Sequence, residues 1–280
     1  MIKIEKRHLK FKKLNVFTAL SNAQGIVSKN KLLNIFDFFK TDVILFTTGY
    51  SFMFILWVLL NKRCVYYFWG FGDSGYLKTL IKKFIIGKCS IIVNHQDHLT
   101  YWKKSKNHIC LLPMWIDTNY LDQFNSLVND GKYYFVPGSN SRSLSLVNKL
   151  IDRGFDVRVA AKNNLDGVKS INYKNLSDEA FLSYFAKSKA ILLPVNNDGH
   201  LPGQTTALEA LYLKKLVFIN RSTTSDLLSG KLIIIIDNKI ESWEKAILKN
   251  DQIDKFDEET IDYNMVLHKH MKFIKKIKLG

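Results

Sequence analysis

The sequence has few residues of the kinds that cross-link or stiffen a chain. It holds 3 cysteines, 4 prolines and 14 glycines in 280 residues. The low glycine and proline content excludes a fibrous or low-complexity protein. The cysteines, Cys64, Cys89 and Cys110, include no pair at metal-binding spacing, and each lies in or beside an apolar run. An odd number of cysteines in apolar surroundings indicates a reducing compartment rather than a disulfide framework.

Long apolar runs are also missing. The longest, Phe52–Leu60, spans nine residues, about half of the roughly 20 that a bilayer crossing needs. It predicts a buried helix. The basic segment Met1–Lys13 has no apolar stretch after it and does not resemble a secretory signal. We therefore expect a cytoplasmic protein that at most lies on a membrane.

Acidic residues are scarce relative to basic ones. Lys and Arg number 41 against 25 Asp and Glu, a formal net charge of +16, in a chain that is otherwise of ordinary globular composition. Such an excess favours an anionic partner: nucleic acid, an anionic membrane surface or a phosphorylated substrate. The alternative is a compositional bias toward Lys, Asn and Ile with no partner. Part of the charge lies in Met1–Lys13 and His268–Gly280. The second segment also has an apolar stripe of Met271, Ile274 and Ile277, typical of membrane-surface helices, although solvated termini would look similar.

Short apolar runs alternate with amphipathic segments along the whole chain, a pattern typical of a parallel sheet covered by helices. One predicted helix, Ser74–Ile86, carries an apolar face of Leu77, Leu80, Ile81, Phe84 and Ile85. The alternation stops at 113–131 and then begins again. We predict one Rossmann-like domain over residues 1–125, a second over 126–262 and a basic C-terminal helix over 263–280. The predicted strands are Leu14–Leu20, Asp42–Thr47, Cys64–Trp69, Cys89–Asn94, His108–Leu112, Tyr133–Pro137, Val157–Ala161, Ala190–Pro194, Val217–Asn220 and Leu232–Ile236.

The segment from Ala190 to Asn220 carries the clearest chemical signal. A buried strand leads through a polar loop into a helix that starts at Gly203 and Gln204–Thr206. Free N–H groups at a helix start bind anions, Gly203 permits close approach, and the hydroxyls of Thr205 and Thr206 add donors. Glu209, one turn on, suits two ribose hydroxyls, as acidic residues do in dinucleotide sites. The pattern predicts a nucleotide site; a capped helix with a solvated glutamate is the alternative.

This segment resembles the donor motif of retaining GT-B glycosyltransferases of the bacterial type-4 (group 1) family. Segments Asn175–Leu193 and Trp115–Tyr120 resemble the family's preceding helix–strand unit and its interdomain linker. The resemblance implies a GT-B fold, two Rossmann-like domains with a cleft between them. The first domain, residues 1–125, would bind the acceptor and the second, residues 126–262, the donor. It also implies sugar transfer with retention from a nucleotide-sugar, without metal or other cofactor. The matching residues are Pro202, Gly203, Ala207, Leu208, Glu209, Ala210, Lys215 and Val217.

The resemblance further implies an acceptor that is lipid-linked or part of a cell-surface polysaccharide, such as lipopolysaccharide, O-antigen or capsule. Such an enzyme works peripherally at the inner face of the cell membrane. The sequence has no Asp-x-Asp motif that would hold a metal. Two other functions remain open. One is a nucleotide-sugar epimerase of the same fold, and the other is a basic nucleic-acid-binding protein. Against the second, the aromatics lie in apolar runs and no nucleic-acid motif is present.

The chain departs from the family pattern in two places. Leu201 stands where the motif has its first glutamate, and Asp198 and His200 just before it are possible substitutes. Because of Leu201, an inactive homologue that only binds a partner stays an alternative. The loop after the first strand of the second domain is shortened. In this loop, Gly138 and Arg142 are the candidates for contact with the diphosphate. Lys162, after the next strand, is the second cation that is a candidate for this contact.

Three further candidates follow strands of the first domain. Gly25 matches the family's glycine loop, which approaches the donor phosphate. Asp73 and His95 are the ionisable groups at predicted strand ends, where open α/β sheets bind ligands. We expect one of these two to act as the catalytic base or to contact the acceptor.

Overall fold

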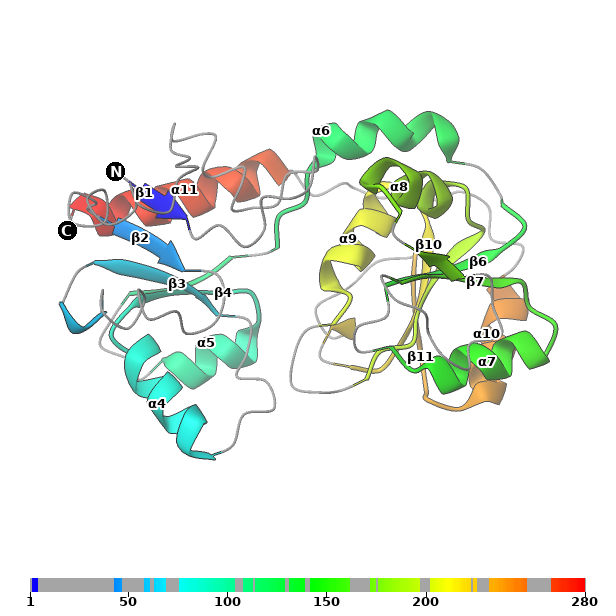
Figure 1. The fold of residues 1–280 in the computed structure, drawn as a ribbon, viewed down its shortest axis with the longest axis horizontal. Coiled ribbons are helices and arrows are strands. Elements are labelled where there is room, and N and C mark those ends of the chain that lie inside the picture. The colour runs from blue at the N-terminus through cyan, green and yellow to red at the C-terminus, as the bar shows by residue number, and fades with distance from the viewer. Residues whose placement is uncertain are drawn as a thin grey trace. The chain divides into compact units, whose positions relative to one another are not determined.

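The computed structural model divides the chain into two compact units, Met1–Trp115 with Asp262–Gly280, and Ile116–Ile261. Each unit is built around one parallel sheet with helices against it (Figure 1), which confirms the predicted pair of α/β domains. The division falls upstream of residue 125, and the C-terminal helix belongs to the first unit. The structure describes residues 2–4, 43–46, 58–60, 63–68, 76–103, 108–112, 114–128, 131–138, 142–161, 172–174, 176–196, 202–222, 224–225, 232–250 and 263–279.

Unit 1 contains a five-stranded sheet whose order follows the chain, β1-β2-β3-β4-β5, with all neighbours parallel. The predicted strand Leu14–Leu20 lies outside the described residues. The strands are β1 (Ile2–Ile4), β2 (Val43–Phe46), β3 (Cys64–Phe68), β4 (Ser90–Val93) and β5 (Ile109–Leu111), and the helices are α4 (Tyr76–Ile86), α5 (Gln96–Trp102) and α11 (Tyr263–Leu279).

The alternating side chains of β3 show which helices cover which face of this sheet. Cys64, Tyr66 and Phe68 share a core with Ile85 and Ile86 of α4 and Trp102 of α5. Tyr67 points the other way and stacks on His270 of α11, with ring centroids 6.0 Å apart. Helices α4 and α5 therefore pack on one face of the sheet and α11 on the other.

The C-terminal apolar stripe has a different role from the one predicted. In α11 the apolar stripe is internal, because Ile274 and Ile277 are buried together with Val266 and His270. At the other end, Ile2–Ile4 pairs with β2 as a parallel strand. The apolar residues that predicted membrane contact at the C-terminus are therefore used to hold unit 1 together. None of the helices within the described ranges is long and apolar enough to cross a bilayer.

Unit 2 contains a six-stranded parallel sheet of order β11-β10-β9-β6-β7-β8. It follows α6 (Thr118–Leu121) and a 3₁₀ turn at Asp122–Leu127. The strands are β6 (Tyr134–Pro137), β7 (Val157–Ala161), β8 (Asn172–Lys174), β9 (Ala190–Leu193), β10 (Leu216–Asn220) and β11 (Ile233–Ile236), and the helices are α7 (Leu144–Asp152), α8 (Asp178–Ala186), α9 (Gln204–Tyr212) and α10 (Ile240–Asn250).

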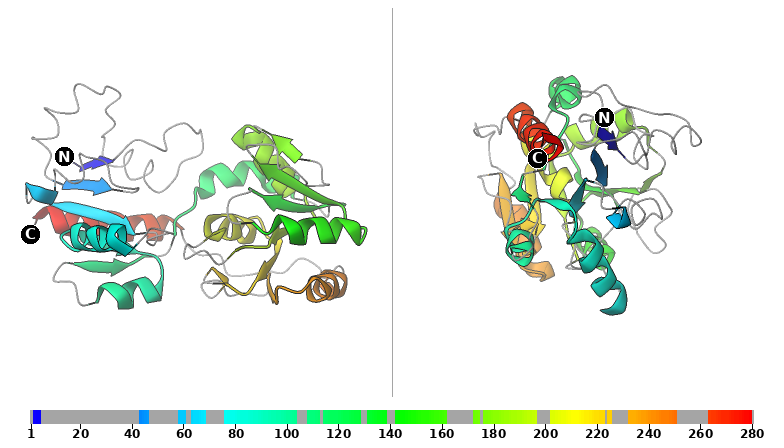
Figure 2. Two further views of the ribbon diagram at one scale, coloured as in Figure 1. Left: turned by 60° about the horizontal axis from the view of Figure 1, so that its bottom comes forward. Right: turned by 90° about the vertical axis from the view of Figure 1, so that its left-hand side faces the viewer.

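Helices pack on both faces of the unit 2 sheet. Val136, Leu192 and Phe218 share one core with residues of α7 and α10, among them the fully buried Trp243. On the opposite face Phe135 contacts α8 through Phe185, their ring centroids 6.2 Å apart. Figures 1 and 2 show α8 and α9 on one side of the sheet and α7 and α10 on the other. This arrangement leaves the carboxyl ends of the strands at one edge, where the loops gather.

Candidate functional site

The strand order of unit 2 has a reversal point between β6 and β9. From β6 the chain runs outward to β7 and β8, then returns to β9 on the other side and continues to β10 and β11. Tyr134 and Phe135 of β6 pair directly with Ala190 and Ile191 of β9. Open α/β sheets bind ligands beside the carboxyl ends of the two strands at such a point. The loops after β6 and β9 are therefore where a ligand site is expected.

These two loops are joined through the main chain. Gly138, which follows β6, has φ +79, and its N–H donates to the carbonyl of Ala160 at 2.8 Å. Arg142 then pairs with Val195 in an isolated antiparallel bridge. The N–H of Ser143 donates to the carbonyl of Pro194 at 2.7 Å. The start of α7 is thereby tied to the chain that leaves β9, and Arg142 is fixed at the reversal point.

The guanidinium of Arg142 lies against Gly203, the N-cap residue of α9. A Cβ atom on Gly203 would stand 3.2 Å from Nη2 of Arg142 and 3.5 Å from Nη1. Nη2 also donates to the carbonyl of Pro137 at 3.3 Å. The residue is only 8% exposed, and burial lowers the pKa of Arg142 to about 10, so the group stays protonated at neutral pH. A buried cation is thus held next to a helix start.

That helix start is itself positive. Gly203 is the N-cap residue of α9, with φ +83, and it offers no side chain to cap the first N–H groups. The N-terminal N–H groups and the helix dipole attract anions. Gln204 is buried, whereas Thr205 and Thr206 are half-buried. Together with Arg142, these groups gather positive charge and hydrogen-bond donors at one place, which suits a phosphate or diphosphate.

Two side chains that sequence reasoning missed, one at the end of β10 and one after it, hold these groups in place. The side-chain amide of Asn220 clamps Val195, accepting from its N–H at 2.6 Å and donating to its carbonyl at 2.8 Å. Thr224 donates through Oγ1 to the carbonyl of Pro202 at 2.9 Å, just before α9. The one signal in the sequence is that Asn220 ends an otherwise apolar strand.

Glu209 is buried in α9, with 3% exposure. Its neighbours Ala207 and Ala210 are fully buried, and they let α9 pack closely on β9 and β10. Lys215, another motif residue, donates from Nζ to the carbonyl of Ser188 at 2.6 Å. Much of the matched motif therefore serves packing. The contact of Glu209 with a ribose stays a prediction.

The predicted linker forms a helix cap. Asp117 Oδ1 accepts from the N–H of Tyr120 at 3.2 Å and opens α6. Its side chain is buried. The aspartate of the Trp115–Tyr120 segment thus has a local structural role at the junction where unit 2 begins.

In unit 1, His95 follows β4 and caps α5. Its Nδ1 accepts from the N–H of Asp97 at 3.0 Å, so that only Nε2 is left for proton transfer. His98, which sequence reasoning did not single out, lies beside it with ring centroids 5.6 Å apart. Burial, with a smaller contribution from His95, lowers the pKa of His98 to about 4. This histidine pair lies at the carboxyl end of β4, and the ring of His98 packs against Phe68.

Three candidates, Gly25, Asp73 and Lys162, lie outside the residues that the structure describes, as does Leu201. Their roles stay predictions. Within the described ranges, no group of three His, Cys, Asp or Glu side chains is placed to hold a metal ion.

Comparison with known proteins bears on the fold. The sequence matches no protein-family model and no curated protein. Among solved structures, a glycosyltransferase from Rickettsia africae is 13% identical over 99% of this chain and 89% of its own, with a TM-score of 0.61. The wall teichoic acid polymerase TagF is 10% identical over 99% and 82% of the two chains, with a TM-score of 0.51. A UDP-N-acetylglucosamine 2-epimerase is 14% identical over 95% of this chain and 77% of its own, with a TM-score of 0.44.

At these identities the likeness establishes the fold alone. The chain has the GT-B architecture of two Rossmann-like domains, which confirms the predicted fold class. The score of the epimerase is too low to bear on function.

Proposed function

We propose that this protein is a glycosyltransferase that moves a sugar from a nucleotide-sugar donor to a glycan acceptor. The observation that carries the proposal is the buried guanidinium of Arg142 against Gly203, at the N-terminus of α9 and beside the reversal point of the sheet. The positive charge of the guanidinium and the positive end of the α9 dipole lie at one place, where they suit the diphosphate of such a donor. The shared fold with the glycosyltransferase from Rickettsia africae supports the same reaction class.

The donor is held through its diphosphate. Arg142 pairs with phosphate oxygens, and the N–H groups and hydroxyls at Gln204–Thr206 donate to them. Gly138 and Gly203 let the nucleotide approach the main chain, and Glu209 accepts the ribose hydroxyls. Lys162 and Gly25, on the family resemblance, contact the same phosphates.

The reaction breaks the bond between the anomeric carbon and the diphosphate oxygen and forms one to an acceptor hydroxyl on the same face of the sugar. The leaving diphosphate gains negative charge, which Arg142 and the α9 dipole stabilise. The acceptor proton passes to the leaving phosphate oxygen, and configuration is retained. No metal or other cofactor takes part. Asp73 or His95 contacts the acceptor, His95 through Nε2.

The proposed acceptor is a lipid-linked or cell-surface polysaccharide, of the lipopolysaccharide, O-antigen or capsule kind. The enzyme meets it at the inner face of the cell membrane. The net charge of +16 supports this proposal, since anionic lipids attract basic proteins. Nucleic acid is not a proposed partner.

The proposal is tested by calorimetric titration with UDP, GDP, CDP and ADP. We expect one diphosphate to bind clearly more tightly than the others. Arg142→Gln removes a charge-assisted contact worth about 2 kcal/mol, so the Kd for that nucleotide should rise roughly thirtyfold.

The matched control is Arg153→Gln in the same unit, an arginine that pairs with Glu241 and Glu244 on the surface. It should leave the Kd unchanged. Equal affinities of wild type and Arg142→Gln would contradict the assignment of the diphosphate. Conversion of the donor sugar to an epimer without any acceptor would instead favour epimerase chemistry.

A further inference from the structure

Helix α4 exposes most of the face that its sequence pattern predicted to be buried. Among the α4 side chains that the structure describes, Ile85 and Ile86 enter the core of unit 1. Phe84 is 66% exposed and Ile81 50%, and Leu80 is exposed with them. None of these three side chains belongs to the described core of unit 1, so packing in that core does not account for their apolar character.

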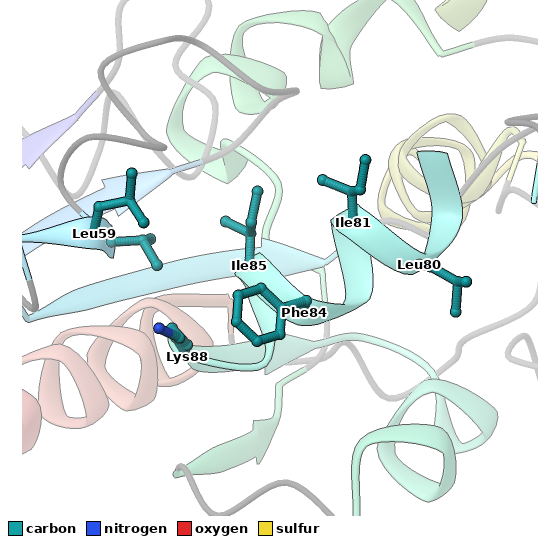
Figure 3. Close-up of a pocket in the computed structure, with 7 residues that line it drawn as sticks. Leu59, Leu80, Ile81, Phe84, Ile85 and Lys88 are labelled. Atoms are coloured by element: carbon teal, nitrogen blue, oxygen red, sulfur yellow. The ribbon is translucent and has the colours of Figure 1, made fainter. Parts of the chain in front are cut away.

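The exposed residues line a groove rather than standing apart. Leu59 and Val58 approach the side of α4 formed by Ile81, Phe84 and Ile85 and enclose a space of about 380 Å³ (Figure 3). Tyr76, at the start of α4, is also exposed. Contiguous apolar surface of this kind marks an interaction site. We refer to the groove and the exposed residues of α4 as the α4 face.

Lysines flank this apolar surface. Lys88 lines the groove, and its Nζ lies 4.9 Å from the ring centroid of Phe84. Lys83 is exposed, with Nζ 4.7 Å from the ring centroid of Tyr101. The sequence of α4 contains no acidic residue, and none of the described residues that line the groove is acidic. Lysines of this kind lay their stems on apolar surface and keep their charges at its rim.

We propose that the α4 face docks on an anionic lipid bilayer, with Phe84 and Ile81 entering the headgroup boundary and Lys83 and Lys88 meeting lipid phosphates. A helix with an apolar side, flanking lysines and no acidic residue has the character of an interfacial helix. A second copy of the chain is the poorer occupant. A two-fold contact would pair this face with itself, and neither α4 nor the described groove lining offers an acidic partner to the lysines. The inference rests on the proposed function in one respect, that a lipid-linked acceptor brings the enzyme to a membrane.

The experiment measures binding of the full chain to vesicles by co-sedimentation. Wild type should bind vesicles of phosphatidylglycerol and phosphatidylcholine, and bind pure phosphatidylcholine at least about tenfold more weakly, because the lysines then lose their anionic partner. Phe84→Glu should weaken binding to the mixed vesicles by about tenfold or more, since it removes an apolar contact and adds a repelled charge.

The matched control is Leu248→Glu on α10 of unit 2, where the leucine is 59% exposed. It adds the same charge to another helix and should bind as wild type. Thermal unfolding of both variants should match wild type, because neither side chain is buried.

Three results would overturn the inference: no binding of wild type to anionic vesicles, equal binding of Phe84→Glu and wild type, or a dimer in light scattering that Phe84→Glu dissociates. The nucleotide titration separates this inference from the proposed function. Loss of nucleotide binding with intact vesicle binding contradicts the transferase, and the reverse contradicts the docking face alone.

Discussion

Replacing Gly203 with alanine tests whether the close contact of Arg142 with the α9 N-terminus forms a phosphate site. The substitution has two consequences in the structure. It forces an L-residue into φ +83, and it places a Cβ atom 3.2 Å from Nη2 of Arg142. Gly154, after α7, has φ +89, and its added Cβ would meet nothing within 4 Å. Gly154→Ala therefore carries the backbone cost without the contact and serves as the matched control.

The two variants should lose similar stability and differ in nucleotide affinity. An alanine in the left-handed region costs about 1 kcal/mol, which urea unfolding of both variants should show. In Gly203→Ala the guanidinium must also shift by roughly a few tenths of an ångström, which weakens a charge-assisted hydrogen bond to phosphate. We expect that loss to be about 1.5 kcal/mol, or roughly tenfold in Kd. Calorimetric titration with the preferred nucleoside diphosphate measures it.

Gly154→Ala should bind the nucleotide as wild type does. If Gly203→Ala loses no more affinity than Gly154→Ala, the guanidinium does not contact the phosphates. The donor would then have to bind elsewhere along the strand ends. A much larger loss of stability in Gly203→Ala, with affinity intact, would show that Arg142 holds the loop and nothing more.

Two further predictions concern stability. Asn220→Ala removes both side-chain hydrogen bonds to the buried main chain of Val195 and should cost about 2 to 3 kcal/mol in urea unfolding, whereas a loss under roughly 0.5 kcal/mol would contradict the clamp. For His98 the folded pKa of about 4 lies below the unfolded value near 6.5, so the folded state binds fewer protons and acid favours unfolding. Stability should be constant above pH ~7 and fall between about pH 6.5 and 4. His98→Asn should flatten that fall in urea midpoints measured across this range, and an unchanged slope would refute the assignment.

The elements of unit 2 could be predicted from the sequence because its strands are buried on both faces. The run predicted as Ala190–Pro194 is β9 at Ala190–Leu193, and the helix predicted after Gly203 is α9. Apolar runs bounded by polar loops leave little choice when a sheet is covered on each side. The start of α9 after Gly203 followed from the same pattern, and the binding of an anion there stays a prediction.

Which surface each amphipathic helix covers could not be predicted. Periodicity shows that Leu80, Ile81 and Phe84 share a face of α4, but it does not show that another element packs on that face. The same limit explains α11, where Ile274 and Ile277 looked like a membrane stripe and are buried in unit 1. The apolar stripe of α11 is buried and the described part of the α4 face is largely exposed, the reverse of what hydrophobic patterning alone indicated.

Arg142 shows why the site needs more than the motif. Ala207, Ala210 and Lys215 match the donor motif, yet each has a packing or tethering role that any Rossmann-like unit of this kind would need. Arg142 is different, because burying a guanidinium beside the positive end of a helix costs free energy, as its lowered pKa reflects. Packing alone does not favour a cation at that place. The proposed donor diphosphate would meet both the buried charge and the helix dipole, so the nucleotide titration of Arg142→Gln is the measurement on which the donor site depends.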